Sequence, residues 1–319
     1  MTLNAAPTAV IALGGNALAP AGEKSTIYDQ FRHTRESLGP IVELARDGWN
    51  VCVVHGNGPQ VGDELVRNEI ARAEASPLPL GVLVAATAGW IGYMIQQSIE
   101  NALRRAGSAR DVVTVITQVQ VRADDPALAN PSKFIGQPLS AGRAAELRRE
   151  GQTVKPDGRG NLRRVVGSPV PQAIHELDTI KRLVEAGTLV VACGGGGAPV
   201  YLNVLREWEG LDAVIDKDLA AAVLARDLGA KLLLILTDVD AVYADWGTPQ
   251  QRALRQLTVS EAEQMDRAGA FGEGSMAPKV RAAIDFARRT GGRAIITVLD
   301  RGQDAVRGEA GTTITAETA

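Results

Sequence analysis

The chain is poor in the residues on which metal-binding and disulfide-linked proteins depend. Its 319 residues include two cysteines, three histidines and 4% aromatic residues. Cys52 and Cys193 each lie inside an apolar run, which favours two small buried side chains over a disulfide or a metal pair. This usage indicates a reducing, cytoplasmic compartment. Because His33, His55 and His175 show no metal-ligand spacing, we expect neither a protein-built metal site nor a metal-dependent hydrolase.

Signatures of nucleic-acid-binding and membrane proteins are also missing. The formal net charge is -3, with 34 basic against 37 acidic residues, whereas a general nucleic-acid binder is markedly basic. The first seven residues lack the pattern of a signal peptide. Leu78 to Ile95 is largely apolar, but it contains Pro79 and three glycines and has acidic flanks, which favours a buried segment over a transmembrane helix. We therefore expect neither a nucleic acid nor a membrane as partner.

The sequence does contain short continuous apolar runs alternating with helical patterns. Continuous runs are typical of strands covered on both faces, and the alternation predicts a three-layer αβα sandwich with a mainly parallel sheet. Ligands then belong at the carboxyl ends of the strands. The runs are 9–13, 50–54, 111–116, 188–192, 231–236 and 294–298, with a final strand expected near 309–314. Helices are expected at 29–47, 59–74, 89–106, 172–186, 216–228, 259–268 and 277–290.

Residues 122–168 interrupt this alternation. They are rich in aspartate, proline and glycine, and 155–161 has the composition of a hairpin or loop beside a short strand at 163–166. We predict a small inserted lid subdomain here, within one domain that spans residues 1–319.

Glycine-rich turns follow two of the predicted strands. The first contains Gly14, Gly15 and Asn16, and the second contains Gly56, Asn57 and Gly58. Glycine lets a ligand approach the backbone, and exposed N–H groups near a helix N-terminus form an anion site. A tight strand-to-helix turn is the alternative for the first loop. If the two loops face one another, they form a cradle for a small anion.

Two other features near these loops have competing interpretations. His55 is expected to act as a capping or hydrogen-bonding residue more than as a catalytic base. Gly194–Gly197 follows a strong apolar strand, which favours close approach to phosphate or substrate over a flexible linker. Neither a P-loop nor a G-x-G-x-x-G motif is present.

Charged residues next to predicted strand and helix ends suggest phosphoryl chemistry. Lys217, between Asp216 and Asp218, opens a helix, although Asp216 is equally suited to be its N-cap. Lys279 lies in the first turn of another helix, and Lys133 lies in the predicted lid. Phosphoryl transfer needs in-line positioning and positive charge on the equatorial oxygens more than covalent chemistry. Three lysines and two sets of glycine N–H groups meet that need, although each lysine alone is also typical of a protein surface.

The ordered set of motifs resembles the carbamate kinases of the amino acid kinase superfamily. The matching segments span nearly the whole chain. They are ALGGNAL (12–18), HGNGPQVG (55–62), NPSK (130–133), VVGSPVP (165–171), GGGG (194–197), VIDKDL (214–219), ILTDVD (235–240) and GSMAPKV (274–280). The resemblance implies an eight-stranded, mostly parallel sheet, a protruding subdomain and a homodimer. It also implies transfer between ATP and carbamate giving ADP and carbamoyl phosphate, with Mg2+, often run toward ATP in arginine catabolism.

The resemblance also assigns roles to individual residues. Gly14, Gly15 and Asn16 would bind the transferring phosphoryl group and the substrate, opposite Gly56, Asn57 and Gly58. Lys133 would reach in from the lid, Lys217 and Lys279 would bind the nucleotide phosphates, and Asp216 would orient the lysines. The residues along the nucleotide would be Thr237, Asp238, Val239, Tyr243, Gly274, Ser275 and Met276.

Three residues and one segment decide how far the resemblance extends. Many members of the superfamily carry a lysine where this chain has Ala12; carbamate kinases lack it, and Lys133 takes its place. Ala88 stands where glutamine is expected and Phe134 where proline is expected, and 201–208 also differs. These departures leave open another small carboxylate or carbamate-like substrate.

Two further alternatives are less favoured. A kinase for a phosphate monoester should carry extra arginines near residues 56–62, and the first arginine after this loop is Arg67. A non-catalytic regulator that binds nucleotide should have lost the lysines, which are all present.

Replacing Lys133, Lys217 or Lys279 by alanine is expected to lower turnover by orders of magnitude and to leave the fold intact. Each substitution removes positive charge from the transferring phosphoryl group. Steady-state assays of ATP formation on each variant, with circular dichroism as the folding control, measure this effect. Wild-type rates in the alanine variants would refute the assigned roles.

Overall fold

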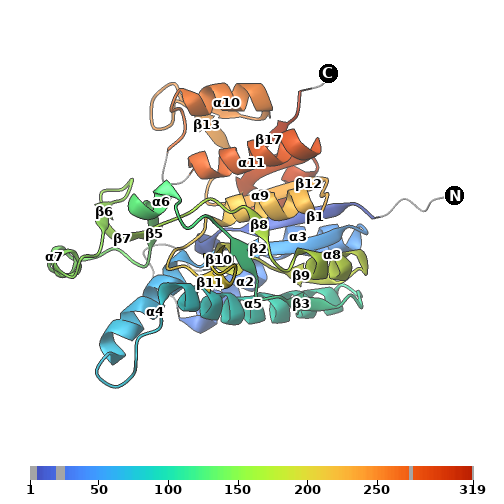
Figure 1. Ribbon diagram of the computed structural model, residues 1–319. Helices are drawn as coiled ribbons and strands as arrows, with labels where there is room; N and C mark the ends of the chain where they lie inside the picture. Colours follow the sequence, from blue (N-terminus) through green and yellow to red (C-terminus); the bar gives the residue numbers. More distant parts are fainter. Residues whose placement is uncertain (1–5, 19–25, 273–275, 318–319) are drawn as a thin grey trace.

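A computed structural model describes residues 6–18, 26–272 and 276–317, and an eight-stranded sheet forms its centre (Figure 1). The strand order is β15-β17-β16-β12-β1-β2-β9-β3, and neighbours pair in parallel except β16 with β17. The strands are β1 (Thr8–Leu13), β2 (Asn50–His55), β3 (Val112–Thr114), β9 (Leu189–Val191), β12 (Leu232–Thr237), β15 (Gln256–Thr258), β16 (Arg293–Val298) and β17 (Thr312–Thr315). The predicted α/β sandwich with a mainly parallel sheet is confirmed.

Two hydrophobic cores, one on each face of the sheet, explain the continuous apolar runs. Successive side chains of a strand point to opposite faces, so Val10 and Ala12 of β1 enter one core while Ala9, Ile11 and Leu13 enter the other. The first core is closed by α8 (Leu177–Glu185), α9 (Lys217–Asp227), α10 (Val259–Arg267) and α11 (Met276–Thr290). The second is closed by α1 (Gly15–Leu18), α3 (Gly39–Arg46), α5 (Leu80–Arg105) and α12 (Gly302–Val306).

The helix predicted at 29–47 is instead two helices, and the helix predicted at 89–106 is longer. α2 (Ile27–Glu36) ends before Pro40, which occupies the first turn of α3, a position that proline favours. α5 begins at Leu80, directly after Pro79.

The glycines of α5 are sites of close packing. A Cβ at Gly92 would lie 2.3 Å from Cγ2 of Thr114, and one at Gly81 would lie 2.9 Å from the carbonyl oxygen of Leu211. Packing therefore outweighs the low helix propensity of glycine here. Among the helices of the described ranges, none combines the length and the apolarity that crossing a membrane requires.

Smaller sheets that the sequence did not predict lie beside the sandwich. One has the order β11-β10-β4-β8, formed by β4 (Gln118–Gln120), β8 (Ala173–Ile174), β10 (Ala198–Leu202) and β11 (Trp208–Gly210). Another is the hairpin of β13 (Val242–Ala244) and β14 (Arg252–Leu254). Their strands have two to five residues, too few for a clear periodicity in the sequence.

Residues 122–168, called the lid from here on, form an antiparallel sheet with its own small core. The sheet order is β5-β7-β6, and α7 packs on it through Ala144 and Leu147, which meet Val154. The elements are β5 (Lys133–Ile135), β6 (Val154–Pro156), β7 (Leu162–Val166), α6 (Pro126–Ala129) and α7 (Ala141–Arg149). The lid projects from the sandwich, and its strand β5 contacts α4 (Gly58–Ala71), the helix that follows β2 (Figure 1).

Candidate active site

The two glycine-rich loops touch one another at the carboxyl ends of β1 and β2. The amide of Gly56 donates to the carbonyl of Leu13 at 3.1 Å. A Cβ on Gly56 would lie 3.1 Å from the nitrogen of Gly15, and one on Gly15 would lie 3.3 Å from Cδ of Pro59. Glycine is therefore needed so that the two backbones can meet. The opposed arrangement that the sequence predicts is present in the structure, and Asn16 follows in α1, with its side chain outside the described part.

The first loop also lies against the end of β12. The amide of Gly14 donates to the carbonyl of Leu236 at 3.1 Å, and a Cβ on Gly14 would lie 3.9 Å from Cα of Thr237. The carboxyl ends of three neighbouring central strands, β2, β1 and β12, therefore lie in contact through these loops.

The Gly194–Gly197 loop packs directly against the second glycine-rich loop. All four glycines are buried, and the last three have φ between 69° and 89°. A Cβ on Gly194 would lie 2.5 Å from Nε2 of His55, and one on Gly195 would lie 2.3 Å from Nδ2 of Asn57. Backbone conformation and packing against protein atoms are each sufficient to require glycine at these positions. The loop supports the second glycine-rich loop from behind.

His55 and Asn57 are buried side chains that shape this region. Burial lowers the pKa of His55 to about 4, against backbone hydrogen bonds at Gly56 and Ala88 that raise it. His55 is therefore neutral at physiological pH, with Nδ1 3.0 Å from the carbonyl oxygen of Gly56. Asn57 donates from Nδ2 to Oγ1 of Thr87 at 2.9 Å. These contacts favour the hydrogen-bonding interpretation of His55 over a catalytic base.

Three lysines from distant parts of the chain converge on two carboxylates. Lys133 Nζ lies 2.5 Å from Oδ2 of Asp216. Lys217 Nζ lies 2.5 Å from Oδ1 of Asp218, and Lys279 Nζ lies 3.3 Å from the other oxygen of Asp218. The sequence predicts that Asp216 orients the lysines; the structure divides the direct contacts between Asp216 and Asp218. Three ammonium groups against two carboxylates leave one net positive charge.

Local structure explains how these side chains are positioned. Asp216 is the N-cap of α9, and its Oδ1 accepts from the amides of Asp218 at 2.9 Å and Leu219 at 3.3 Å. The capping interpretation of Asp216 is thus correct, and its second oxygen remains available for the lid lysine. Because Lys217 opens the same helix, its side chain passes the second loop, where a Cβ on Gly56 would lie 3.2 Å from Cδ of Lys217.

The electrostatics of this cluster depend on mutual pairing. Burial would raise the pKa of Asp218, but Lys217 and Lys279 hold it below its usual value. Burial likewise opposes ionisation of Asp216, and Lys133 and the other lysines overcome it, so its pKa is also lowered. Burial lowers the pKa of Lys217 below the usual 10.5 despite Asp218. Burial would also lower the pKa of Lys279, but Asp218 and Asp216 raise it.

The residues predicted along the nucleotide lie around the end of β12 and the start of α11. Thr237 ends β12 and donates from Oγ1 to Asp238 at 3.0 Å. Tyr243, on β13, donates to Asp240 at 2.7 Å, and this bond raises the pKa of its phenol. Val239 lies in the bend that connects β12 with β13, Met276 begins α11, and Gly274 and Ser275 lie outside the described residues.

A hollow of about 440 Å³ lies at the other end of the strands, near the amino ends of β2, β3 and β9. Arg110 lines it, but its guanidinium donates to the carbonyls of Ala45, Trp49 and Gly187 at 2.6 to 3.2 Å. This arginine joins three loops and gives no reason to place the chemistry there. Across the described ranges, no group of three or more His, Cys, Asp or Glu side chains is arranged to hold a metal ion.

Comparison with known proteins identifies the family. The model of the amino acid kinase family matches residues 7–297. The carbamate kinase of Pyrococcus horikoshii is 44% identical over 309 residues, which cover 96% of this chain and 98% of that protein. This chain is a member of the carbamate kinases within the amino acid kinase family. The carbamate kinase of Halobacterium salinarum is 46% identical over 310 residues, covering 96% of this chain and 97% of that protein.

Solved carbamate kinase structures share the fold over the whole chain. Carbamate kinase from Giardia lamblia bound to citric acid has a TM-score of 0.92 at 37% identity, and covers 98% of this chain and 99% of that one. The same enzyme bound to AMP-PNP has a TM-score of 0.89, with the same identity and coverage.

Asp218 is the residue whose importance sequence reasoning underestimated. It stands beside Lys217 in the motif, but its contact with Lys279, 61 residues away, depends on how α9 and α11 pack. Only its position two residues after Asp216 signalled a role, because the first turn of a helix places both carboxylates near its N-terminus.

Asp218→Asn is expected to lower kcat/KM by orders of magnitude and to move the alkaline limb of the pH profile to lower pH. A lysine loses its charge as the pH rises through its pKa, and the Asp218 carboxylate raises the pKa of Lys217. Without that carboxylate, Lys217 loses its charge at lower pH. Measurements of kcat/KM between about pH 6 and 10 test this.

Asp285→Asn is the matched control, because Asp285 lies on α11 with Lys279 and pairs with the exposed Arg289. It should keep the wild-type profile. An unchanged alkaline limb in Asp218→Asn would contradict the assignment of Asp218 as the shared counter-ion.

Proposed function

We propose that this protein transfers a phosphoryl group reversibly between ATP and carbamate, giving ADP and carbamoyl phosphate. The observation that carries the proposal is the convergence of Lys133, Lys217 and Lys279 on one carboxylate pair, with Lys217 beside the Gly56 loop. The names of the relatives support carbamate as the acceptor. AMP-PNP in a carbamate kinase from Giardia lamblia supports a nucleotide as the donor.

The geometry supports an in-line transfer without a general base. The carbamate oxygen is already anionic, so it attacks the γ-phosphorus of ATP while the bond from phosphorus to the β–γ bridging oxygen breaks and ADP leaves. The lysines, which carry one positive charge more than the two carboxylates balance, would neutralise negative charge on the transferring group. The backbone amides near Gly15 and Gly58 would hold the equatorial oxygens.

We further propose that Mg2+ arrives with the nucleotide as part of the substrate. Mg2+ usually binds through one or two carboxylates, phosphate oxygens and water. Asp238, which is exposed beside Thr237 and attracts Lys279, has the oxygen ligands that such a complex requires. When bound, the cation would add positive charge to the phosphates; the lysines would orient them.

The side chains of Ala88 and Phe134, which depart from the family pattern, pack against neighbouring residues. Ala88 lies behind the second glycine-rich loop. A Cβ added to Gly194 would lie 2.9 Å from the Cβ of Ala88. The ring of Phe134 lies 5.7 Å from the guanidinium carbon of Arg163 within the lid. The third departure, 201–208, lies in and around the β10–β11 hairpin, whose Val204 is 98% exposed. These contacts leave the charges of the lysine cluster unchanged, although the carbonyl oxygen of Phe134 would lie 3.6 Å from a Cβ on Gly58.

A coupled assay of ATP formation tests this proposal. Purified protein with MgADP should form ATP from carbamoyl phosphate with a kcat/KM at least about a hundredfold above that for acetyl phosphate or acetylglutamyl phosphate. Each mixture is repeated with the Lys217→Ala variant to remove background. Faster use of either competing acyl phosphate would contradict the proposal and favour a kinase for another small carboxylate.

We also propose that the protein is a homodimer, located in the cytoplasm, and that α5 lies in its interface. Val82, Ala86, Gly89 and Tyr93 recur at helical spacing on the side of α5 that faces away from the core. Val82 is 47% and Tyr93 57% exposed. An apolar stripe on an otherwise buried helix is typical of an interface. The free, buried Cys52 and Cys193 are compatible with a reducing compartment.

Tyr93→Asp combined with Val82→Asp is expected to convert the dimer to a monomer, because each carboxylate would have to be desolvated in the interface. Sedimentation equilibrium measures the mass. Trp246→Asp, at a 61% exposed aromatic residue between β13 and β14, is the control and should remain dimeric. A dimer in the double variant would exclude this face.

A further inference from the structure

The lid is attached to α4 by an apolar contact and a backbone hydrogen bond. Ile135 and Val166 of the lid pack in one cluster with Val61 of α4. The amide of Gly136 donates to the carbonyl of Gly58 at 2.9 Å. These contacts lie at the end of α4 that carries the second glycine-rich loop. Apolar burial is non-directional, so the angle of the lid depends on its directional contacts, of which this hydrogen bond is one.

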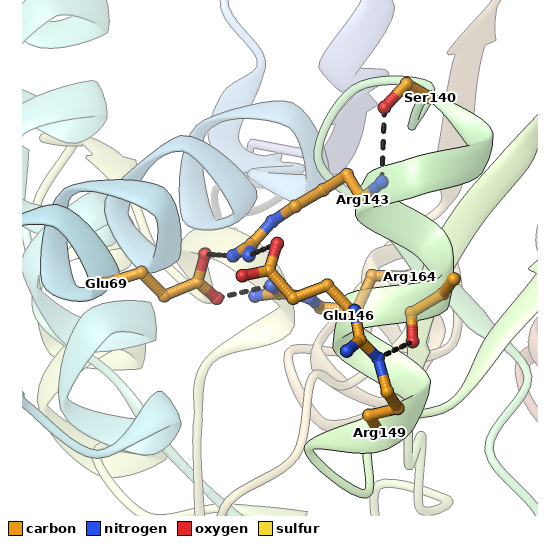
Figure 2. A network of polar contacts seen from close by, with 7 residues as sticks. Glu69, Ser140, Arg143, Glu146, Arg149 and Arg164 are labelled. Carbon is orange, nitrogen blue, oxygen red and sulfur yellow. Dashed lines mark hydrogen bonds and ion pairs between the residues drawn. The ribbon is translucent and has the colours of Figure 1, made fainter.

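A charged contact lies at the other end of α4 (Figure 2). One carboxylate oxygen of Glu69 accepts from Arg143 of α7, and the other accepts from Arg164 of β7. Arg143 also donates to Glu146 at 2.5 Å. Eleven residues separate Glu69 from Gly58, which is about 16 Å along a helix. The two attachments of the lid are therefore well separated, and together they can fix its angle.

Burial makes the loss of one partner of the Glu69 contact costly. The side chain of Arg164 is 8% exposed, that of Glu69 18% and that of Arg143 31%. Removing one member of a buried ion pair leaves the other charge desolvated and uncompensated. Without the carboxylate of Glu69, two guanidinium groups would face one another across the gap that it fills. We expect the lid to move away from α4 in that case.

The strand that binds Glu69 is paired with the strand that carries Lys133. In the antiparallel pair of β5 and β7, Ile135 lies opposite Arg164 and Lys133 lies opposite Val166. A shift of Arg164 is therefore transmitted to Lys133 two residues along the sheet. Lys133 contacts Asp216 through Nζ at 2.5 Å, so a small rotation of the lid breaks this contact.

We propose that Glu69 is a positioning residue for the phosphoryl-transfer reaction: by binding Arg143 and Arg164 it holds the lid at the angle that places Lys133 in the lysine cluster. This role rests on the proposed function of Lys133. Glu69 lies at the far end of α4 from the glycine-rich loop and acts only through the lid.

Glu69→Gln tests the proposal, because it keeps the size of the side chain and removes its charge. Hydrogen exchange is measured by mass spectrometry on peptides covering 133–136 and 162–166. Exchange there should become about tenfold faster, the effect of losing one charge-assisted hydrogen bond. kcat/KM for carbamoyl phosphate should fall about tenfold in the same variant.

A second background separates positioning from general damage. In Lys133→Ala, adding Glu69→Gln should change kcat/KM less than about twofold, since the lysine that it positions is already absent. Glu64→Gln is the matched control, because Glu64 pairs with Arg67 on α4 itself; exchange and rates should stay at wild-type values. If Glu69→Gln does not fold, Arg143→Gln replaces it, because Arg143 is the more exposed partner, with the same expected directions.

Unchanged exchange in the lid peptides would overturn the proposal, as would a tenfold loss that persists in the Lys133→Ala background. The exchange measurement uses no substrate. It therefore reports on the contact even if carbamate is not the acceptor, so a failure of this inference is distinguishable from a failure of the proposed function.

Discussion

The site depends on the pairing of buried lysines with the carboxylates of Asp216 and Asp218. Ammonium groups repel one another at short range, and burial of any one of them without a counter-charge costs several kcal/mol. The carboxylates face the same penalty, so each set is stable only in the presence of the other. Two carboxylates against three lysines leave the positive charge that a phosphoryl group needs. In the proposed reaction, the same pairs that stabilise the lysine cluster would also prepare it for a phosphoryl group.

Glycine provides the second constraint, because the lysine cluster is useful only beside a backbone that a phosphate can reach. Contact between Gly15 and Gly56 brings the ends of β1 and β2 together, and Gly194–Gly197 fills the space behind them. These strand ends belong to the continuous central sheet, whereas Lys133 lies on a separate small sheet. Most of the site is therefore built on the central sheet, and in our proposal the lid attachment at Glu69 positions the remaining lysine.

Several features of the molecule have physical causes that act only in three dimensions. The sequence predicts a helix only from residue 89, whereas α5 begins at Leu80; close contacts with Thr114 and Leu211 favour glycine in this helix despite its low helix propensity. At 194–197 the structure shows a packing requirement for glycine against His55 and Asn57, which a sequence does not distinguish from a requirement for a ligand. Arg143 and Arg164 of the lid contact α4 at Glu69, about 16 Å along the helix from Gly58, and a contact between segments so far apart in the chain has no signal in the sequence.

The sequence by itself determined the layered α/β fold, the strands whose ends carry chemistry, the family, and the three lysines as candidates. Each of these depends on local patterns or on motifs whose residues are contiguous in the sequence. Only the tertiary structure decided that Asp218 is shared by Lys217 and Lys279, that His55 is buried and neutral, and that Glu69 joins the lid to α4. Those features arise where residues far apart in the chain meet, and their energies depend on burial and distance, which a linear sequence does not contain.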